Sequence, residues 1–246
     1  MRYEAPHSLE DAVSLLAKEA GSAKILAGGT DLLVQLKSGV VEPDLVVDLK
    51  RIAAMREIRE EKGGYRIGAA VPSASLREHK AFRTMCTAVI EGAKLIGSTQ
   101  VQGRATLTGN LCNASPAADS VPGMVACGAT ARIVGPKGSR DVPVQEVPAG
   151  PGKTTLAKGE VIESIFFPAQ APHTGSAYLR FTPRTEMDIA VVSAGVAITL
   201  DDKGVCTAAR VALGAVAARI VVAEEAAKAL IGTKVDDAAL DKMAAA

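Results

Sequence analysis

Residues 24–37 read KILAGGTDLLVQLK, and the fold predicted for the rest of the chain is built outward from this stretch. An apolar strand pattern ends at Gly28-Gly29, and a helical pattern begins after Thr30 and Asp31. Paired glycines tolerate the positive φ of a backbone nest, whose N–H groups bind an anion such as phosphate. Thr30 or Asp31 is suited to cap the short helix, whose N-terminus would add to this attraction. The alternative is a tight turn that binds nothing.

A second polar stretch, GRATLTGNLCNASPAADS, covers residues 103–120. It is rich in glycine and in short hydroxyl and amide side chains, which hydrogen-bond phosphates and sugar hydroxyls at close range. An apolar helical run begins at Val121, so the stretch by itself is also compatible with a loop before a capped helix. Two such stretches far apart in the chain favour a ligand long enough to touch both.

Composition excludes several classes of function. The chain has 246 residues, enough for two or three small domains, with 48% hydrophobic and 22% charged residues. A net charge of +1 without a basic block argues against a nucleic-acid partner. No apolar run is long enough to cross a membrane, and the N-terminal segment lacks the apolar centre of a signal peptide. We therefore expect a cytoplasmic protein.

The cysteines and histidines of the chain are not spaced to form a metal site or a set of disulfides. The cysteines lack CxxC spacing, which disfavours a disulfide framework and an iron–sulfur or zinc site within this chain. Cys112 lies in the second polar stretch and is either a reduced structural thiol or a contact near a ligand. The three histidines share no metal-ligand spacing. These residues are Cys86, Cys112, Cys127 and Cys206, with His7, His79 and His173.

Residues 150–155, GPGKTT, imitate the end of a phosphate-binding P-loop. The full pattern requires glycine five residues before Gly152, where this chain has Val147. Pro148 and Pro151 also interrupt the strand that would feed such a loop. An ATPase is therefore disfavoured.

Hydrophobic periodicity predicts three regions. A capping box at Ser8 opens a helix with a buried face of Leu9, Ala12, Val13, Leu16 and Ala20, which ends at Gly21. Together with strands 24–27 and 45–49 and a helix over 30–38, it forms a βαβ-type unit with Gly28-Gly29 at the carboxyl end of a strand. The second region is predicted to contain a hairpin over 57–69 turning at 62–64, a helix capped by Ser73 or Ser75, helices over 88–97 and 119–129, and strands at 129–135, 140–144 and 159–168. The third region is predicted to contain strands at 177–182, 189–200 and 205–214 with a turn at 201–204, and helices over 221–231 and from 236.

Three ordered motifs make the chain resemble a known family. AGGTDL, then TLTGN followed by ASPAAD, and finally RTEMDIA resemble the FAD-binding subunit of the molybdenum hydroxylases, which include xanthine dehydrogenases and aerobic carbon monoxide dehydrogenases. The resemblance covers nearly the whole chain. It implies an α+β fold, with two FAD-binding subdomains of the vanillyl-alcohol-oxidase / p-cresol-methylhydroxylase type and a C-terminal three-stranded sheet with helices. The implied domains are 1–55 (βαβ-type), 56–172 (α+β) and 173–246 (α+β). Relatives usually continue further, so the last domain is expected to be incomplete.

The resemblance also implies the residues that hold FAD. The first motif would bind the pyrophosphate through its backbone and Thr30, and the second would bind the phosphate and ribityl portions. Asp119 would bind a ribityl or ribose hydroxyl, since a carboxylate repels phosphate. Arg180 would be a cation that favours reduced flavin. The full set is Ile25, Leu26, Ala27, Gly28, Gly29, Thr30, Asp31, Leu32, Ile96, Thr106, Leu107, Thr108, Gly109, Asn110, Asp119, Ile162, Arg180, Asp188 and Ile189.

Simpler structural roles remain open for some of these residues. Ile96 and Ile162 would pack against the cofactor, and Ile189 stands near the flavin ring where some relatives have an aromatic residue. Each of the three isoleucines is equally compatible with plain core. Arg180 and Asp188 are equally compatible with a surface ion pair.

The function implied by the resemblance is electron transfer. FAD would receive electrons from [2Fe-2S] clusters on a small iron–sulfur subunit and pass them to NAD+, oxygen or a quinone. A large molybdopterin subunit would complete a dimer of heterotrimers, and this chain would hold no metal and no catalytic acid or base. Two alternatives stay open: a self-contained FAD oxidoreductase, and a scaffold subunit without flavin whose glycine loops are only turns.

Overall fold

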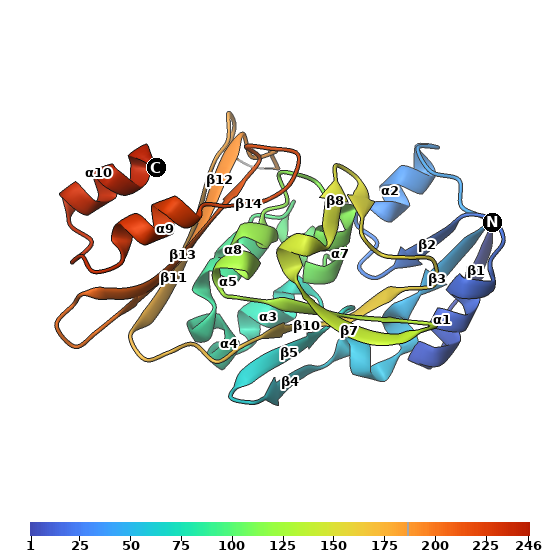
Figure 1. Cartoon of the computed structure of the whole chain (residues 1–246). Helices are drawn as coiled ribbons and strands as arrows, with labels where there is room; N and C mark the ends of the chain where they lie inside the picture. The colour runs from blue at the N-terminus through green and yellow to red at the C-terminus, as the bar shows by residue number, and fades with distance from the viewer. Residues whose placement is uncertain (186) are drawn as a thin grey trace.

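The structure is a computed structural model that describes residues 1–185 and 187–246, so Glu186 of the RTEMDIA motif lies outside the described residues. The described residues form a three-stranded, a five-stranded, a four-stranded and a small two-stranded sheet. Figure 1 shows the three larger sheets following one another along the molecule, with the two termini at opposite ends of the view. The fold is mixed α and β, as the sequence predicts. None of the described helices is both long and apolar enough to cross a membrane.

The N-terminal unit is a parallel sheet in the order β1-β3-β2, which confirms the predicted βαβ arrangement. Its first strand was not predicted, because three residues are too few to show a pattern. The glycine pair lies one residue after β2, beyond Ala27, at the carboxyl end of the sheet. The elements are β1 (Arg2–Glu4), α1 (Leu9–Lys18), β2 (Ala23–Leu26), α2 (Leu32–Lys37) and β3 (Leu45–Asp48), followed by the 3-10 turns η1 (Leu49–Arg51) and η2 (Ala53–Arg56).

Helix α1 begins as the capping box predicts, since the Ser8 hydroxyl accepts a hydrogen bond from the backbone N–H of Asp11. The predicted end of the helix is wrong. Glu19 already has an extended backbone, with φ −63° and ψ 121°, so the chain leaves the helix before Ala20. Ala20 is therefore exposed, and Gly21 does not end the helix.

The central sheet is antiparallel, in the order β4-β5-β10-β6-β7. The hairpin of β4 (Ile58–Glu61) and β5 (Gly64–Gly68) confirms the predicted turn, because Lys62 and Gly63 both have positive φ. Strand β10 (Val161–Phe167) lies in the middle, beside β6 (Thr130–Gly135) and β7 (Gly138–Pro143). Between β7 and β10 lie η3 (Val144–Glu146) and the β8–β9 hairpin (Pro148–Gly150 and Lys153–Thr154).

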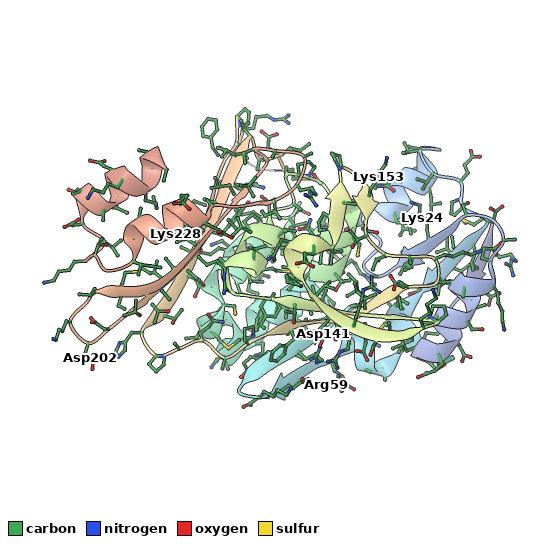
Figure 2. The ribbon with its side chains drawn as sticks, in the orientation of Figure 1. Lys24, Arg59, Asp141, Lys153, Asp202 and Lys228 are labelled. Carbon is green, nitrogen blue, oxygen red and sulfur yellow. The ribbon has the colours of Figure 1, made fainter. Side chains whose placement is uncertain are left out.

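The two faces of the central sheet differ in character. One face carries charged residues, among them the labelled Arg59 and Asp141 (Figure 2). On this face the Arg66 guanidinium is paired with Glu61 and packed over the Phe166 ring, which lets a cation be almost fully buried. The other face is apolar and is covered by helices that lie above the sheet in Figure 1. These are α3 (Ser73–Glu78), α4 (Lys80–Met85), α5 (Thr87–Ala93), α7 (Leu107–Asn113) and α8 (Ser120–Ala126), and the short α6 (Thr99–Gln102) contacts α3.

Three expectations about these helices need correction. Neither Ser73 nor Ser75 caps α3, because Pro72 holds the N-cap position and the Ser73 hydroxyl donates to the carbonyl of Ala105. The helix expected over 88–97 ends at Ala93. The polar stretch 103–120 is not only a loop, since it contains α7.

The C-terminal sheet has four strands, in the order β11-β12-β13-β14, and not the three expected. The added strand, β14 (Val221–Val222), is too short for periodicity to reveal. The β12–β13 hairpin confirms the predicted turn at 201–204. Helices α5 and α8 lie on one side of this sheet, and α9 and α10 lie on the other (Figure 1). The remaining bounds are β11 (Thr174–Phe181), β12 (Val192–Leu200), β13 (Cys206–Gly214), α9 (Glu224–Leu230) and α10 (Asp237–Ala245).

Glycines let helix α8 pack closely against its neighbours. A Cβ added at Gly123 would lie 2.6 Å from the carbonyl oxygen of Ala88 on α5, and one added at Gly195 on β12 would lie 2.4 Å from that of Pro122. The helical layer and the C-terminal sheet are thus joined with almost no space between backbones.

Candidate functional site

The two glycine-bearing stretches meet at one cavity of about 670 Å³. Gly28 and Gly109 both line it, so stretches far apart in sequence share a cleft. The approach is closest at Gly28, where an added Cβ would lie 2.1 Å from the carbonyl oxygen of Arg104. Only glycine allows the turn after β2 to rest against the backbone that precedes α7.

The turn itself presents free backbone donors. Among the residues the structure describes, the N–H groups of Gly28, Gly29, Thr30 and Asp31 find no acceptor in the protein. Gly29 has a φ of +83°, which turns the chain here as the sequence predicts for a nest. Asp31 precedes α2, but its side chain makes no capping hydrogen bond, and Thr30 lies outside the cap position. The donors are therefore left for a ligand.

On the opposite wall, the second stretch is held rigid by its own side chains. Thr106 caps α7, with its hydroxyl accepting from the N–H of Gly109 at 2.9 Å. The Asn110 side-chain oxygen accepts from the N–H and the hydroxyl of Ser120 at 3.2 and 2.6 Å, which ties α7 to the start of α8. Hydrogen bonds within the protein therefore fix the positions of these polar groups.

Three polar side chains connect the two walls. The amide of Asn113 on α7 donates to the carboxylate of Asp31 at 3.4 Å, and Gln35 on α2 donates to the Asn113 oxygen at 3.4 Å. All three line the cavity.

Most of the FAD-binding residues predicted from the sequence line this cavity, but some do not. Leu26 and Leu107 are buried in the core and turn away from the cavity. Ile162 lines the cavity and also belongs to the core, whereas Ile96 is half-buried. Those lining the cavity are Ile25, Ala27, Gly28, Gly29, Thr30, Asp31, Leu32, Ile96, Thr106, Thr108, Gly109, Asn110 and Ile162.

Asp119 and Arg180 form a buried ion pair that does not line this cavity. The Arg180 guanidinium and the Tyr178 hydroxyl each donate to one Asp119 carboxylate oxygen at 2.7 Å. The side chains of Arg180 and Asp119 are only 7% and 11% exposed. Burial raises the pKa of Asp119, although the hydrogen bond from Tyr178 and the charge of Arg180 act in the opposite direction.

The expected alternative of an ion pair between Arg180 and Asp188 is wrong. Asp188 pairs with Arg184 at 3.0 Å, and this lowers the pKa of the Asp188 carboxyl to about 2. Ile189 is 73% exposed, so the alternative that it is plain core is also wrong.

Comparison with known proteins identifies the family of this chain. Residues 1–170 match the FAD-binding domain of molybdopterin dehydrogenases, and residues 177–246 match the C-terminal domain of the carbon monoxide dehydrogenase flavoprotein. The chain belongs to this family of FAD-binding subunits. It is 34% identical to the carbon monoxide dehydrogenase medium chain of Afipia carboxidovorans, over 99% of this chain and 84% of the relative. The xanthine dehydrogenase FAD-binding subunit of Escherichia coli is 35% identical, over 81% of this chain and 69% of the relative.

Solved structures of related enzymes have the same fold as this chain. A Cu,Mo-CO dehydrogenase chain superimposes with a TM-score of 0.94 and 34% identity, covering all of this chain and 85% of the other. A chain of quinoline 2-oxidoreductase from Pseudomonas putida 86 gives 0.88 and 30%, over 99% of this chain and 84% of the other.

The cavity fits FAD in size and in chemistry. Its volume lies within the roughly 300–1,000 Å³ range of cofactor and ligand sites. Free N–H groups at a glycine turn suit a diphosphate, and a Cβ at Gly28 would force the two walls apart. The lining of this cavity is therefore suited to the cofactor of the family.

Several residues that line the FAD cavity were not selected from the sequence. Residues between Gly152 and Val161 form a third wall next to the predicted Ile162, and the stretch that imitates a P-loop begins it. Figure 2 shows Lys24 on β2 and Lys153 on the β8–β9 hairpin on the same side of the molecule. Asn113 stood within the second polar stretch and could have been chosen on that ground. The remaining lining residues outside the prediction include Leu16, Ala23, Lys24, Gln35, Val40, Val41, Leu49, Ala105 and Cys112.

We expect Cys112 to report on occupation of the cavity. Burial raises the pKa of this thiol to about 12, so only about one molecule in 10⁴ is thiolate at pH 8. In the folded chain without cofactor, alkylation of Cys112 by iodoacetamide should be slow and should accelerate about tenfold per pH unit up to about pH 11. Peptide mass spectrometry measures the rate, and added FAD should slow it further. The same peptide in urea is the control, and a folded-state rate that levels off near pH 9 would contradict the expected pKa.

Proposed function

We propose that this chain is the FAD-carrying electron-transfer subunit of a multi-subunit molybdenum hydroxylase. Bound FAD would accept electrons from [2Fe-2S] clusters of a partner and deliver them to an external acceptor. The observation that carries the proposal is the single cavity shared by Gly28 and Gly109, with free backbone donors at its glycine turn. The chain's own task would be to bind, orient and shield the cofactor.

The cavity walls support the binding roles that the resemblance implies. The N–H groups of Gly28 to Asp31 and the hydroxyl of Thr30 would hold the pyrophosphate, and residues 106–110 would hold the phosphate and ribityl portions. Ile96 and Ile162 would pack against the apolar parts of the cofactor. The roles expected for Asp119, Arg180, Asp188 and Ile189 stay predictions.

We also propose the partners of this chain. Relatives carry names of carbon monoxide and xanthine dehydrogenases, and one matching structure is a carbon monoxide dehydrogenase from Hydrogenophaga pseudoflava that lacks the Mo-pyranopterin moiety of the molybdenum cofactor. Within residues 1–185 and 187–246, no group of three His, Cys, Asp or Glu side chains is placed to hold a metal. The names and titles of these relatives support a small iron–sulfur subunit and a large molybdopterin subunit as partners, and we propose that the subunits assemble as a dimer of heterotrimers.

We also propose a finer description of the fold. The parallel first sheet and the antiparallel second sheet support two subdomains of the vanillyl-alcohol-oxidase / p-cresol-methylhydroxylase type. We keep the divisions 1–55, 56–172 and 173–246. Cytoplasmic location stays a prediction from the sequence.

Co-expression of this chain with the products of neighbouring reading frames tests the function. We expect flavin absorbance bands, iron–sulfur bands and molybdenum to co-purify with it. Flavin in a chain that binds no partner would favour the self-contained oxidoreductase. A complex that assembles without flavin would favour the scaffold subunit and overturn the proposal.

A further inference from the structure

A charged network lies behind the glycine turn, outside the cavity. Asp48, at the end of β3, accepts hydrogen bonds from the Tyr3 hydroxyl at 2.5 Å and from the Lys50 backbone N–H at 2.9 Å. The Lys50 ammonium is 2.8 Å from the same carboxylate and donates to the carbonyl oxygen of Ala27 at 3.2 Å. Lys50 therefore connects β3 with the residue that precedes Gly28.

The end of the parallel sheet explains why this contact forms. The ladder between β2 and β3 stops at the pair Leu26 and Asp48, because the chain enters the 3-10 turn η1 after Asp48. The carbonyl of Ala27 lies one residue beyond the last pair. The Lys50 ammonium donates to that carbonyl in place of the backbone N–H that a longer strand would supply. Asp48 is nearly fully buried, so the carboxylate that holds the ammonium is itself fixed.

The Ala27 carbonyl and the Gly28 N–H belong to one peptide group. An ammonium at the carbonyl fixes the orientation of that peptide, and it polarises the group so that its N–H becomes a stronger donor. In the described part of the chain, this N–H has no protein acceptor, and Gly28 lines the cavity. A cation that lies outside the cavity can thus act on a donor inside it.

We propose that Lys50 is a positioning residue for the dinucleotide phosphate, acting through the Ala27–Gly28 peptide. The proposal rests on the proposed function, because it assigns a role in FAD binding. It concerns a residue that the family motifs do not contain.

The test compares Lys50→Met with Lys50→Arg in the full chain. Methionine keeps the length of the side chain and removes the cation, whereas arginine keeps a cationic donor. Lys37→Met, in the exposed last turn of α2, is the matched control. We expect Lys50→Met to raise the Kd for FAD roughly tenfold, chiefly through faster release, and Lys50→Arg to remain within about threefold of the wild type. Fluorescence of released flavin gives both quantities.

A second readout does not need the cofactor. Hydrogen exchange at the Leu33 amide, which donates to the Gly29 carbonyl of the turn at 3.0 Å, should accelerate in Lys50→Met of the FAD-free chain and not in Lys37→Met. An unchanged Kd and unchanged exchange in Lys50→Met would overturn the role of Lys50. Failure of Lys50→Arg to restore the Kd would also overturn it, because a merely structural defect would explain the loss. If the wild-type chain binds no FAD, the proposed function fails, while the exchange data still test whether Lys50 orders the turn.

Discussion

Gly28→Ala is expected to remove stable FAD binding from this chain. The added Cβ would lie 2.1 Å from the Arg104 carbonyl oxygen and 3.1 Å from the Ala105 Cα, and neither backbone atom can move aside as a flexible side chain would. The turn and the segment before α7 must separate, which widens the cavity at the donors for the pyrophosphate. We expect flavin content to fall at least roughly tenfold, and the free energy of unfolding to fall by about 1–3 kcal/mol. Flavin absorbance per chain and urea unfolding measure the two effects.

The matched control is Gly150→Ala, in β8. Gly150 is not at a positive φ, and an added Cβ there would have no atom within 4 Å. Its unfolding free energy should therefore stay within about 0.5 kcal/mol of the wild type, with full flavin content. Normal flavin binding by Gly28→Ala would show that the close approach at Gly28 is not needed, and the idea of two walls closing on one diphosphate would have to be abandoned.

The parts of the fold that the sequence predicted are those specified by neighbouring residues. The Ser8 cap and the Lys62-Gly63 turn depend on contacts within a few positions, so each can be derived from local chemistry. The glycine turn after β2 is of the same kind. We could predict that this turn lies close to the second polar stretch, because both stretches have the composition of a phosphate-binding site.

The parts that the sequence did not predict depend on contacts between distant residues. Strands β1 and β14 are two or three residues long, and only their pairing with β3 and β13 makes them strands. The third wall of the cavity contains mainly small and apolar residues, and the stretch that begins it was set aside because it lacks the full P-loop pattern. The pairing of Asp119 with Arg180 was also missed, because Asp119 precedes α8 and Arg180 is on β11, far along the chain, whereas Asp188 lies much nearer to Arg180 in sequence. Long-range pairing of charges is not encoded in local patterns.

Arg180→Met is expected to destabilise the chain strongly, because it leaves Asp119 buried without its cation. Removing one member of a buried ion pair costs about 3–5 kcal/mol, and both side chains here are about nine-tenths buried. The Tyr178 hydroxyl would remain the main donor to the carboxylate. Asp119 would respond by taking up a proton, since burial already raises its pKa and the opposing charge of Arg180 would be lost.

This response makes the destabilisation depend on pH, with a definite sign. An acid whose pKa is higher in the folded state than in the unfolded state, where it is about 4, keeps its stability contribution below that value and loses it as the pH rises through the folded pKa. The difference in unfolding free energy between wild type and Arg180→Met should therefore be smaller at pH 5 than at pH 8 in urea titrations. Adding Asp119→Asn to the variant removes the titrating group, so the double variant should recover stability at pH 8 and lose the pH dependence. An equal destabilisation at both pH values would mean that Asp119 stays ionised without Arg180, so that water or another donor must reach its carboxylate.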